Sequence, residues 1–174
     1  MSDSTPAPGS HYADPGPLGL AAFAATTFVL SFANTGVFKA EPVVFSLALI
    51  FGGLAQVLAG MWEFAKGNTF GATAFTSYGA FWISFWYLTN HTDLTGLTGK
   101  QVQHGIAMWL LVWTIFTAYM LVASLGTKNY ALIGVFAALT LTFLFLTLGA
   151  HGQDPTSMTH DGMTKLGGWL GVIT

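Results

Sequence analysis

Long apolar runs separated by short polar breaks dominate this chain. Five runs are long enough to cross a bilayer core, which takes about 20 helical residues; they cover residues 18–38, 43–64, 70–90, 102–125 and 130–150. The breaks hold Gly, Pro, Asn and Lys, which are typical of turns and helix ends. None of the runs alternates with the period of two that transmembrane β-strands show. The pattern therefore predicts membrane-spanning helices, which satisfy their own backbone polar groups.

The two ends of the chain differ from these runs. Residues 1–16 are rich in Pro, Gly, Ser and Asp, and we expect them to form a disordered tail before a transmembrane helical domain at 17–174. A sixth apolar run begins at residue 166 and the sequence stops at 174. Such a run is too short to cross a bilayer. We expect an all-α membrane protein, a six-transmembrane-helix bundle whose sixth helix is truncated here, and a natural protein that continues.

Composition supports a lipid environment. Hydrophobic residues make up 53% of the chain and charged residues 7%, whereas soluble domains carry about 25% charged residues. The basic residues form no patch, which argues against nucleic acid as a partner. Lys66 and Lys128 lie in two short breaks and favour a cytoplasmic N-terminus only weakly.

The sequence shows no catalytic or metal-binding constellation. There is no phosphate-binding loop, no Gly-x-Ser-x-Gly and no cysteine, and the histidines lack the spacing of a metal site. We interpret all of them as solvated loop residues: His11, His91, His104, His151 and His160. An enzyme, a metal site and a cofactor are therefore not expected.

Polar residues inside the first two apolar runs allow two readings. Thr27 and Asn34 share a helical stripe with Phe23, and Gln56 lies near the middle of the second run. They either line a polar pathway or hydrogen-bond a neighbouring helix or their own backbone. Glu63, near the end of the second run, is expected to pair with Lys66 at the surface, with a proton-linked role as the alternative.

The third and fifth runs carry hydroxyls and aromatic rings. In the third, small residues including Thr76 and Gly79 form a ladder, Ser77 lies on a second face, and the Tyr78 phenol near mid-membrane requires a hydrogen-bond partner. In the fifth, Thr140 and Thr147 either line a pore or bond back to their own helix.

The absence of fixed positive charges in the apolar runs indicates which solutes such a pathway could carry. No Lys lies deep in a run and Arg is absent, so hydroxyls, amides, aromatic rings and helix N-termini would meet the solute. These weak sites suit a short organic acid, urea or water about equally.

Several motifs resemble one family, the acetate uptake transporters or succinate–acetate permeases. Residues 67–82, GNTFGATAFTSYGAFW, resemble its most characteristic segment, and 17–20, PLGL, its N-terminal signature. FGGLAQ at 51–56 and GWLG at 168–171 agree with it. The usual signature is Asn-Pro-Ala-Pro-Leu-Gly-Leu, so Asp14 and Gly16 are departures here. Asp can also cap a helix, but its charge lies near the expected mouth.

The resemblance implies a plasma (inner) membrane protein with six transmembrane helices, arranged as a ring-shaped homo-hexamer with one pathway per protomer. It implies transport of acetate, with succinate and other short carboxylates as lesser substrates, by an anion channel or a proton symporter. Matching positions imply a constriction formed by Phe23, Tyr78 and Leu139. Along the path we expect hydrogen bonds from Thr27, Asn34, Gln56, Thr76 and Ser77.

Two alternatives remain open at this stage. One is a urea, amide or water channel of similar helical architecture. The other is a membrane protein that transports nothing, such as a sensor or an assembly partner. We also expect that the chain truncated in its sixth helix would not transport by itself.

Overall fold

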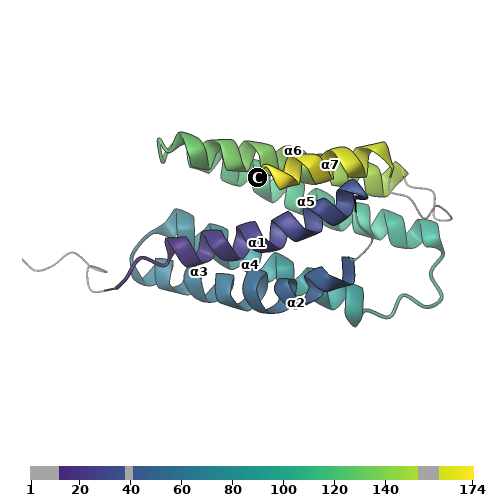
Figure 1. Cartoon of the computed structure of the whole chain (residues 1–174), viewed down its shortest axis with the longest axis horizontal. Helices are drawn as coiled ribbons and strands as arrows, with labels where there is room; N and C mark the ends of the chain where they lie inside the picture. Colours follow the sequence, from purple (N-terminus) through teal and green to yellow (C-terminus); the bar gives the residue numbers. More distant parts are fainter. Residues whose placement is uncertain (1–11, 38–40, 153–160) are drawn as a thin grey trace, which may run out of the picture. The chain divides into compact units, whose positions relative to one another are not determined.

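The computed structural model describes residues 12–37, 41–152 and 161–174 (Figure 1). All regular structure in these ranges is helical. In chain order the elements are α1 (Gly16–Thr35), η1 (Glu41–Val43), α2 (Val44–Leu49), η2 (Ile50–Ala55), α3 (Gln56–Ala65), α4 (Thr69–Asn90), α5 (Gly99–Leu125), α6 (Tyr130–Gly152) and α7 (Gly162–Val172).

The all-helical character is confirmed, and capping explains where two of the helices begin. α5 begins at Gly99, earlier than expected, because Thr98 and Gln101 form a capping box. α7 begins at Gly162 because the Asp161 side chain accepts a hydrogen bond from the Thr164 N–H at 2.7 Å. Of the expected tail, residues 1–11 lie outside the described residues, and Gly16 already belongs to α1.

Four described helical segments are long and apolar enough to cross a membrane: Gly16–Thr35, Val44–Ala65, Gly99–Leu125 and Tyr130–Gly152. The chain is thus a multi-pass membrane protein. α4 has 22 residues, a sufficient length, but its glycine, hydroxyl and aromatic content lowers its hydropathy. α7 has 11 residues, about 16 Å of helix. The count of six spanning helices remains a prediction.

The second span is not one regular helix. Its middle segment, η2, is a π-helix between the α-helical turns of α2 and α3. Gly52 and Gly53 are buried within it, and the Gln56 N–H donates to the Gly53 carbonyl. Wide π turns inside α-helices recur at functional sites. The hydropathy pattern predicted this span without indicating the π segment.

The described residues fall into two compact units. Among them, unit 1 comprises residues 12–26 and 45–90, and unit 2 comprises residues 27–37, 41–44, 91–152 and 161–174. In unit 1, the first part of α1 packs against η2, α3 and α4 through glycines. A Cβ on Gly19 would lie 2.7 Å from the Phe75 ring, and one on Gly79 would lie 2.6 Å from Val57. Side chains at these glycines would push the helices apart.

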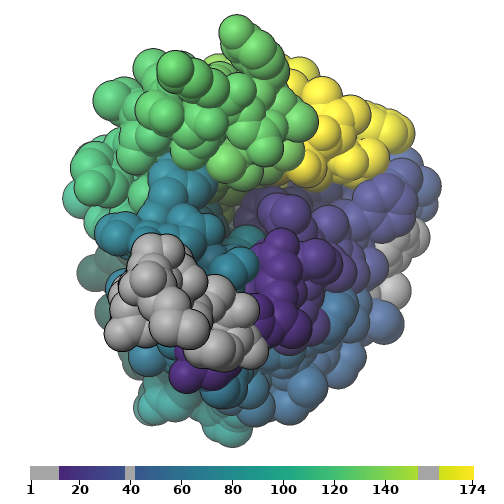
Figure 2. All heavy atoms as spheres, turned by 90° about the vertical axis from the view of Figure 1, so that its left-hand side faces the viewer, coloured from purple at the N-terminus to yellow at the C-terminus, as the bar shows by residue number. Residues whose placement is uncertain are grey.

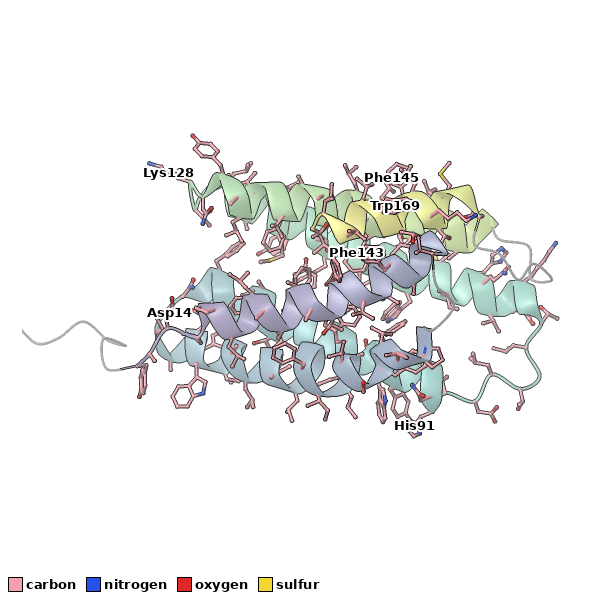
Figure 3. All side chains as sticks on the ribbon, in the orientation of Figure 1. Asp14, His91, Lys128, Phe143, Phe145 and Trp169 are labelled. Carbon is pink, nitrogen blue, oxygen red and sulfur yellow. The ribbon has the colours of Figure 1, made fainter. Side chains whose placement is uncertain are left out.

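In unit 2, α5 and α6 are joined by a tight turn at Lys128, whose φ is 55° (Figure 3). α6 and α7 lie side by side (Figures 1 and 2). The hydroxyls of Thr114 on α5 and Thr147 on α6 are 3.1 Å apart and form a hydrogen bond between the helices. The Trp169 ring on α7 (Figure 3) packs edge-on against Phe32, with centroids 6.2 Å apart.

Candidate functional site

A buried aromatic pair is the centre of the candidate site in unit 1. The rings of Phe23 on α1 and Tyr78 on α4 have centroids 5.5 Å apart and planes inclined by 60°, a favourable arrangement for two aromatic rings. Phe23 is 9% exposed and Tyr78 is 3% exposed. The structure thus brings together two of the three predicted constriction residues. Leu139 is buried on α6 in unit 2, and a constriction of all three remains a prediction.

Gln56 lies at the level of this aromatic pair. Two close contacts show how α1 lies along the second span. Gly16 lies next to Glu63, and Gly52 lies next to Thr26. The two helices are therefore antiparallel, and Gln56 falls opposite the part of α1 that carries Phe23. Contacts with α4 join Gly60 to Thr76 and Gly79 to Val57. On α4, Gln56 therefore lies within about one helical turn of Tyr78.

The Gln56 side chain is buried without a complete set of hydrogen bonds. It is 1% exposed, and its Oε1 atom accepts no hydrogen bond from the described residues. Gln56 lies seven residues from Glu63, so both side chains leave α3 on the same face. A buried amide oxygen without a donor is unfavourable by itself, so this position calls for a partner that the described residues do not supply.

Two further side chains on α4 share this property. The Nε1–H of Trp82 and the hydroxyl of Thr76 find no partner among the described residues. Trp82 is 2% exposed and follows Tyr78 by one helical turn. Trp82 is not among the site residues predicted from the sequence. The sequence feature that could have identified it is its indole N–H, which is always a donor and needs a partner inside an apolar run.

Thr27 and Asn34 lie in unit 2. Thr27 is buried and its hydroxyl also lacks a partner among the described residues. Asn34 is half-buried on α1, and Ser77 is half-buried on α4. The roles of the five predicted lining residues remain predictions.

Other membrane hydroxyls bond to their own helices. Thr140 donates to the Phe136 carbonyl at 2.7 Å and Thr147 to the Phe143 carbonyl at 2.8 Å. For the fifth run, the alternative of back-bonding to its own helix is therefore confirmed. The hydroxyls of Thr27 and Thr76 differ from these, because they have no hydrogen-bond partner among the described residues and so could bind a solute.

Glu63 is buried, and its predicted surface pair with Lys66 is wrong. Glu63 is 2% exposed, and its Oε2 accepts a hydrogen bond from Asn68 Nδ2 at 2.8 Å. Asn68 also accepts from the Gly71 N–H at 3.1 Å, which connects the carboxylate to the first turn of α4. The carboxylate turns inward because it leaves α3 on the face directed at α1 and α4.

Lys66 pairs with Asp14 instead, at 2.7 Å. Asp14 also accepts from the Gly16 N–H at 3.1 Å, at the start of α1. The hydrogen bond from Lys66, and then that from Gly16, lowers the pKa of Asp14 below its usual value. The same pairing raises the pKa of Lys66. The negative charge that Asp14 adds near the expected mouth is therefore offset by Lys66.

Two of the predicted loop histidines lie in helices. His104 on α5 and His151 on α6 are exposed, and their rings stack with centroids 4.9 Å apart and planes inclined by 21°. His91 follows the end of α4 (Figure 3), and His11 and His160 lie outside the described residues. Among the residues with described positions, no group of His, Cys, Asp and Glu could hold a metal ion.

Comparison with known proteins adds to this geometry. The sequence model of the GPR1/FUN34/yaaH family matches residues 1–174. Acetate permease A of Emericella nidulans is 41% identical over 172 residues, which cover 93% of this chain and 57% of that protein. The succinate-acetate/proton symporter SatP of Escherichia coli is 35% identical over 161 residues, covering 92% of this chain and 81% of SatP.

A solved structure, that of the bacterial acetate channel SatP, has the same fold. It matches with a TM-score of 0.80 and 35% sequence identity, and covers 93% of this chain and 85% of that one. Three of the relatives are longer than this chain, which spans 57%, 62% and 59% of their lengths.

Proposed function

The chain belongs to the GPR1/FUN34/yaaH family, and on that basis we propose that it transports acetate and other short carboxylates, including succinate, across the plasma membrane. One relative is an acetate permease, another is a succinate-acetate/proton symporter, and the solved structure is that of an acetate channel. None of these is an enzyme, in line with the missing catalytic constellation.

The observation that carries the proposal is the buried aromatic pair of Phe23 and Tyr78, with unpartnered polar atoms next to it in unit 1. Apolar rings with a few neutral hydrogen-bonding groups suit a small solute that sheds most of its water. The described spans contain no Lys at mid-depth that would hold an anion tightly. A weakly held two-carbon acid fits these properties.

The path in this proposal has a gate and a lining. Phe23, Tyr78 and Leu139 form the gate. The lining consists of Thr27, Asn34, Gln56, Thr76 and Ser77. Two observations support these assignments. The three gate side chains are buried, as are Thr27 and Gln56. Thr27, Gln56 and Thr76 each have a buried polar atom without a hydrogen-bond partner among the described residues.

The assembly in this proposal is a ring-shaped homo-hexamer of six-helix protomers, each with its own pathway. The likeness to the SatP channel supports it. Mass measurement of the detergent-solubilised complex tests the assembly, and a monomer or dimer would contradict it.

Two mechanisms are compatible with the site, an anion channel and a proton symporter. Glu63 is the carboxyl group best placed for a proton-linked role, because it is buried between α3 and the start of α4 and held by Asn68. In a channel, Glu63 would only fix the ends of these helices.

The test is uptake of labelled acetate into proteoliposomes that contain the protein. Stimulation by an inward proton gradient would indicate symport, whereas uptake that follows the voltage would indicate a channel. Urea uptake without acetate uptake would favour the amide-channel alternative. Acetate binding without any flux would favour a protein that does not transport.

A further inference from the structure

Two buried hydrogen-bonding atoms of opposite character lie close in height within unit 1. The Oε1 atom of Gln56 is an acceptor and the Nε1–H of Trp82 is a donor, and neither has a partner among the described residues. Both side chains are almost fully buried, at 1% and 2% exposure. Two unsatisfied polar groups at this depth are costly unless a ligand or water completes them.

The packing of α3 on α4 brings these two positions to similar heights. Gly79 lies beside Val57, and Gly53 lies beside Ile83, so the two helices are antiparallel and Trp82 falls opposite the residues just before Gln56. The offset between them is about two residues, or about 3 Å along the helix axis. Gln56 follows Gly52, which meets Thr26 on α1, by four residues, and Trp82 follows Tyr78 on α4 by one helical turn.

The chemistry of the pair discriminates between forms of one substrate. A carboxylate ion offers only acceptors, so it can complete the Trp82 N–H and leaves the Gln56 oxygen unsatisfied. An undissociated carboxylic acid offers an O–H donor and a carbonyl acceptor. A primary amide offers an N–H donor and a carbonyl acceptor in the same arrangement. Both of these ligands can satisfy both protein atoms.

We propose that Gln56 and Trp82 form a subsite for the neutral –CO–XH group of a short carboxylic acid or primary amide, in preference to the carboxylate. The Gln56 oxygen accepts the X–H, and the Trp82 N–H donates to the carbonyl oxygen. Gln56 is then the residue that determines specificity, and Trp82 binds both the neutral and the ionised form. This inference rests on the proposed transport function, because the subsite lies beside the aromatic pair of that pathway.

The test uses acetamide, which keeps the donor and acceptor at every pH, as a probe of the neutral form. Labelled acetate uptake into proteoliposomes is measured at neutral pH with increasing acetamide, after subtraction of protein-free liposomes. Binding is measured separately, as the acetamide-dependent rise of the unfolding temperature of the purified full-length protein. Gln56→Met and Trp82→Phe each remove one polar group and keep an apolar side chain.

We expect acetamide to inhibit acetate uptake by the wild-type protein. Gln56→Met should raise the half-inhibitory acetamide concentration about tenfold, as the loss of one buried hydrogen bond implies, and should raise the KM for acetate by a smaller factor. Trp82→Phe should weaken both ligands. Matched controls are Gln103→Met on α5 and Trp62→Phe, whose side chain is exposed on α3; both should behave like the wild type.

The outcomes separate this inference from the proposed function. Protein-dependent acetate uptake that acetamide does not inhibit, or an acetamide response that Gln56→Met leaves unchanged, would overturn the subsite and leave transport standing. Absence of acetate uptake would overturn the proposed function. The unfolding temperatures would still test the subsite. If acetamide raises the unfolding temperature of the wild type but not that of Gln56→Met, the subsite is supported. If the rise is equal in both proteins, the subsite is overturned.

Discussion

The Asn68 side chain donates a hydrogen bond to the buried carboxylate of Glu63 at 2.8 Å and accepts one from the Gly71 N–H at 3.1 Å. Asn68 thus joins the end of α3 to the first turn of α4. It is the partner that allows a carboxyl group with 2% exposure to remain inside unit 1. Two consequences can be measured, one for stability and one for transport.

Replacing Asn68 with Ala should destabilise the protein. The substitution leaves a Glu63 oxygen and the Gly71 N–H without their partner, and such a loss costs about 1–3 kcal/mol for a buried polar group. Thermal unfolding of the purified protein in detergent measures it. Asn90→Ala is the control, because Asn90 is exposed at the end of α4, and it should change the free energy of unfolding by less than about 0.5 kcal/mol.

Glu63→Gln tests the proton-linked role directly. Gln keeps the shape of the side chain and its acceptor oxygen for Asn68, but it cannot exchange a proton. If uptake by the wild type is stimulated by an inward proton gradient, the variant should keep uptake and lose that stimulation. A variant whose uptake responds to the gradient as before would remove Glu63 from the coupling mechanism.

Tyr78→Ala should widen the constriction and relax size selectivity. The Tyr78 ring packs 5.5 Å from that of Phe23, centroid to centroid, and its removal leaves space beside Phe23. We expect larger monocarboxylates such as butyrate to enter proteoliposomes faster relative to acetate. Tyr78→Phe keeps the ring and should keep the selectivity. Unchanged exclusion of butyrate by the Ala variant would argue against this gate.

Gly60 should tolerate no larger side chain. A Cβ there would collide with the Thr76 hydroxyl and lie 2.6 Å from the Thr76 backbone nitrogen, so Gly60→Ala must separate α3 from α4. We expect a loss of about 1–3 kcal/mol from this overpacking and reduced uptake. Gly134→Ala on α6 is the matched control, because nothing lies within 4 Å of its Cβ position; it should be neutral or stabilising.

The pair of Asp14 and Lys66 predicts a defined pH dependence. The pKa of Asp14 is lowered from 3.8, so its contribution to stability is present above that pH and is lost as the pH falls through the lower folded value. The pKa of Lys66 is raised from 10.5, so its contribution is present below that pH and is lost as the pH rises through the higher folded value.

Asp14→Asn should therefore lower the unfolding temperature by a small, constant amount between about pH 5 and 9. The difference from the wild type should disappear under more acidic conditions, where both side chains are neutral. Because Asn can still accept from the Gly16 N–H, the start of α1 should be kept. A difference that grows as the pH falls would contradict this account.

The helices and part of the site could be predicted from the sequence, because periodicity and apolar length report on burial in lipid. The helices pack closely at Gly52 and Gly60, since a Cβ at either would collide with Thr26 or Thr76. The environment of Glu63 was predicted wrongly. Spacing alone favoured Lys66, and only the fold brings Asp14 to Lys66, 52 residues away in sequence.

Trp82 illustrates a different limit. Its type and position made it one of several aromatic residues on α4, and only the packing of unit 1 shows that its N–H lacks a partner among the described residues. Likewise, the stacked rings of His104 and His151 depend on how α5 aligns with α6. Neither relation is encoded within one helix, so no periodicity could reveal it.

The π-helical segment Ile50–Ala55 changes the helical phase between the two halves of the second span. Residues before it and after it follow α-helical periodicity, but the wider turn offsets one set from the other. A regular α-helix of the same six residues would have the same length in residues and the same hydropathy, yet it would rotate residues 56–65 by about 100° relative to α2, because the π turn absorbs one extra residue. Gln56 and Glu63 would then leave the face that meets α1 and α4. The face on which Gln56 and Glu63 lie thus depends on this π-helical segment, which the composition of the span does not reveal.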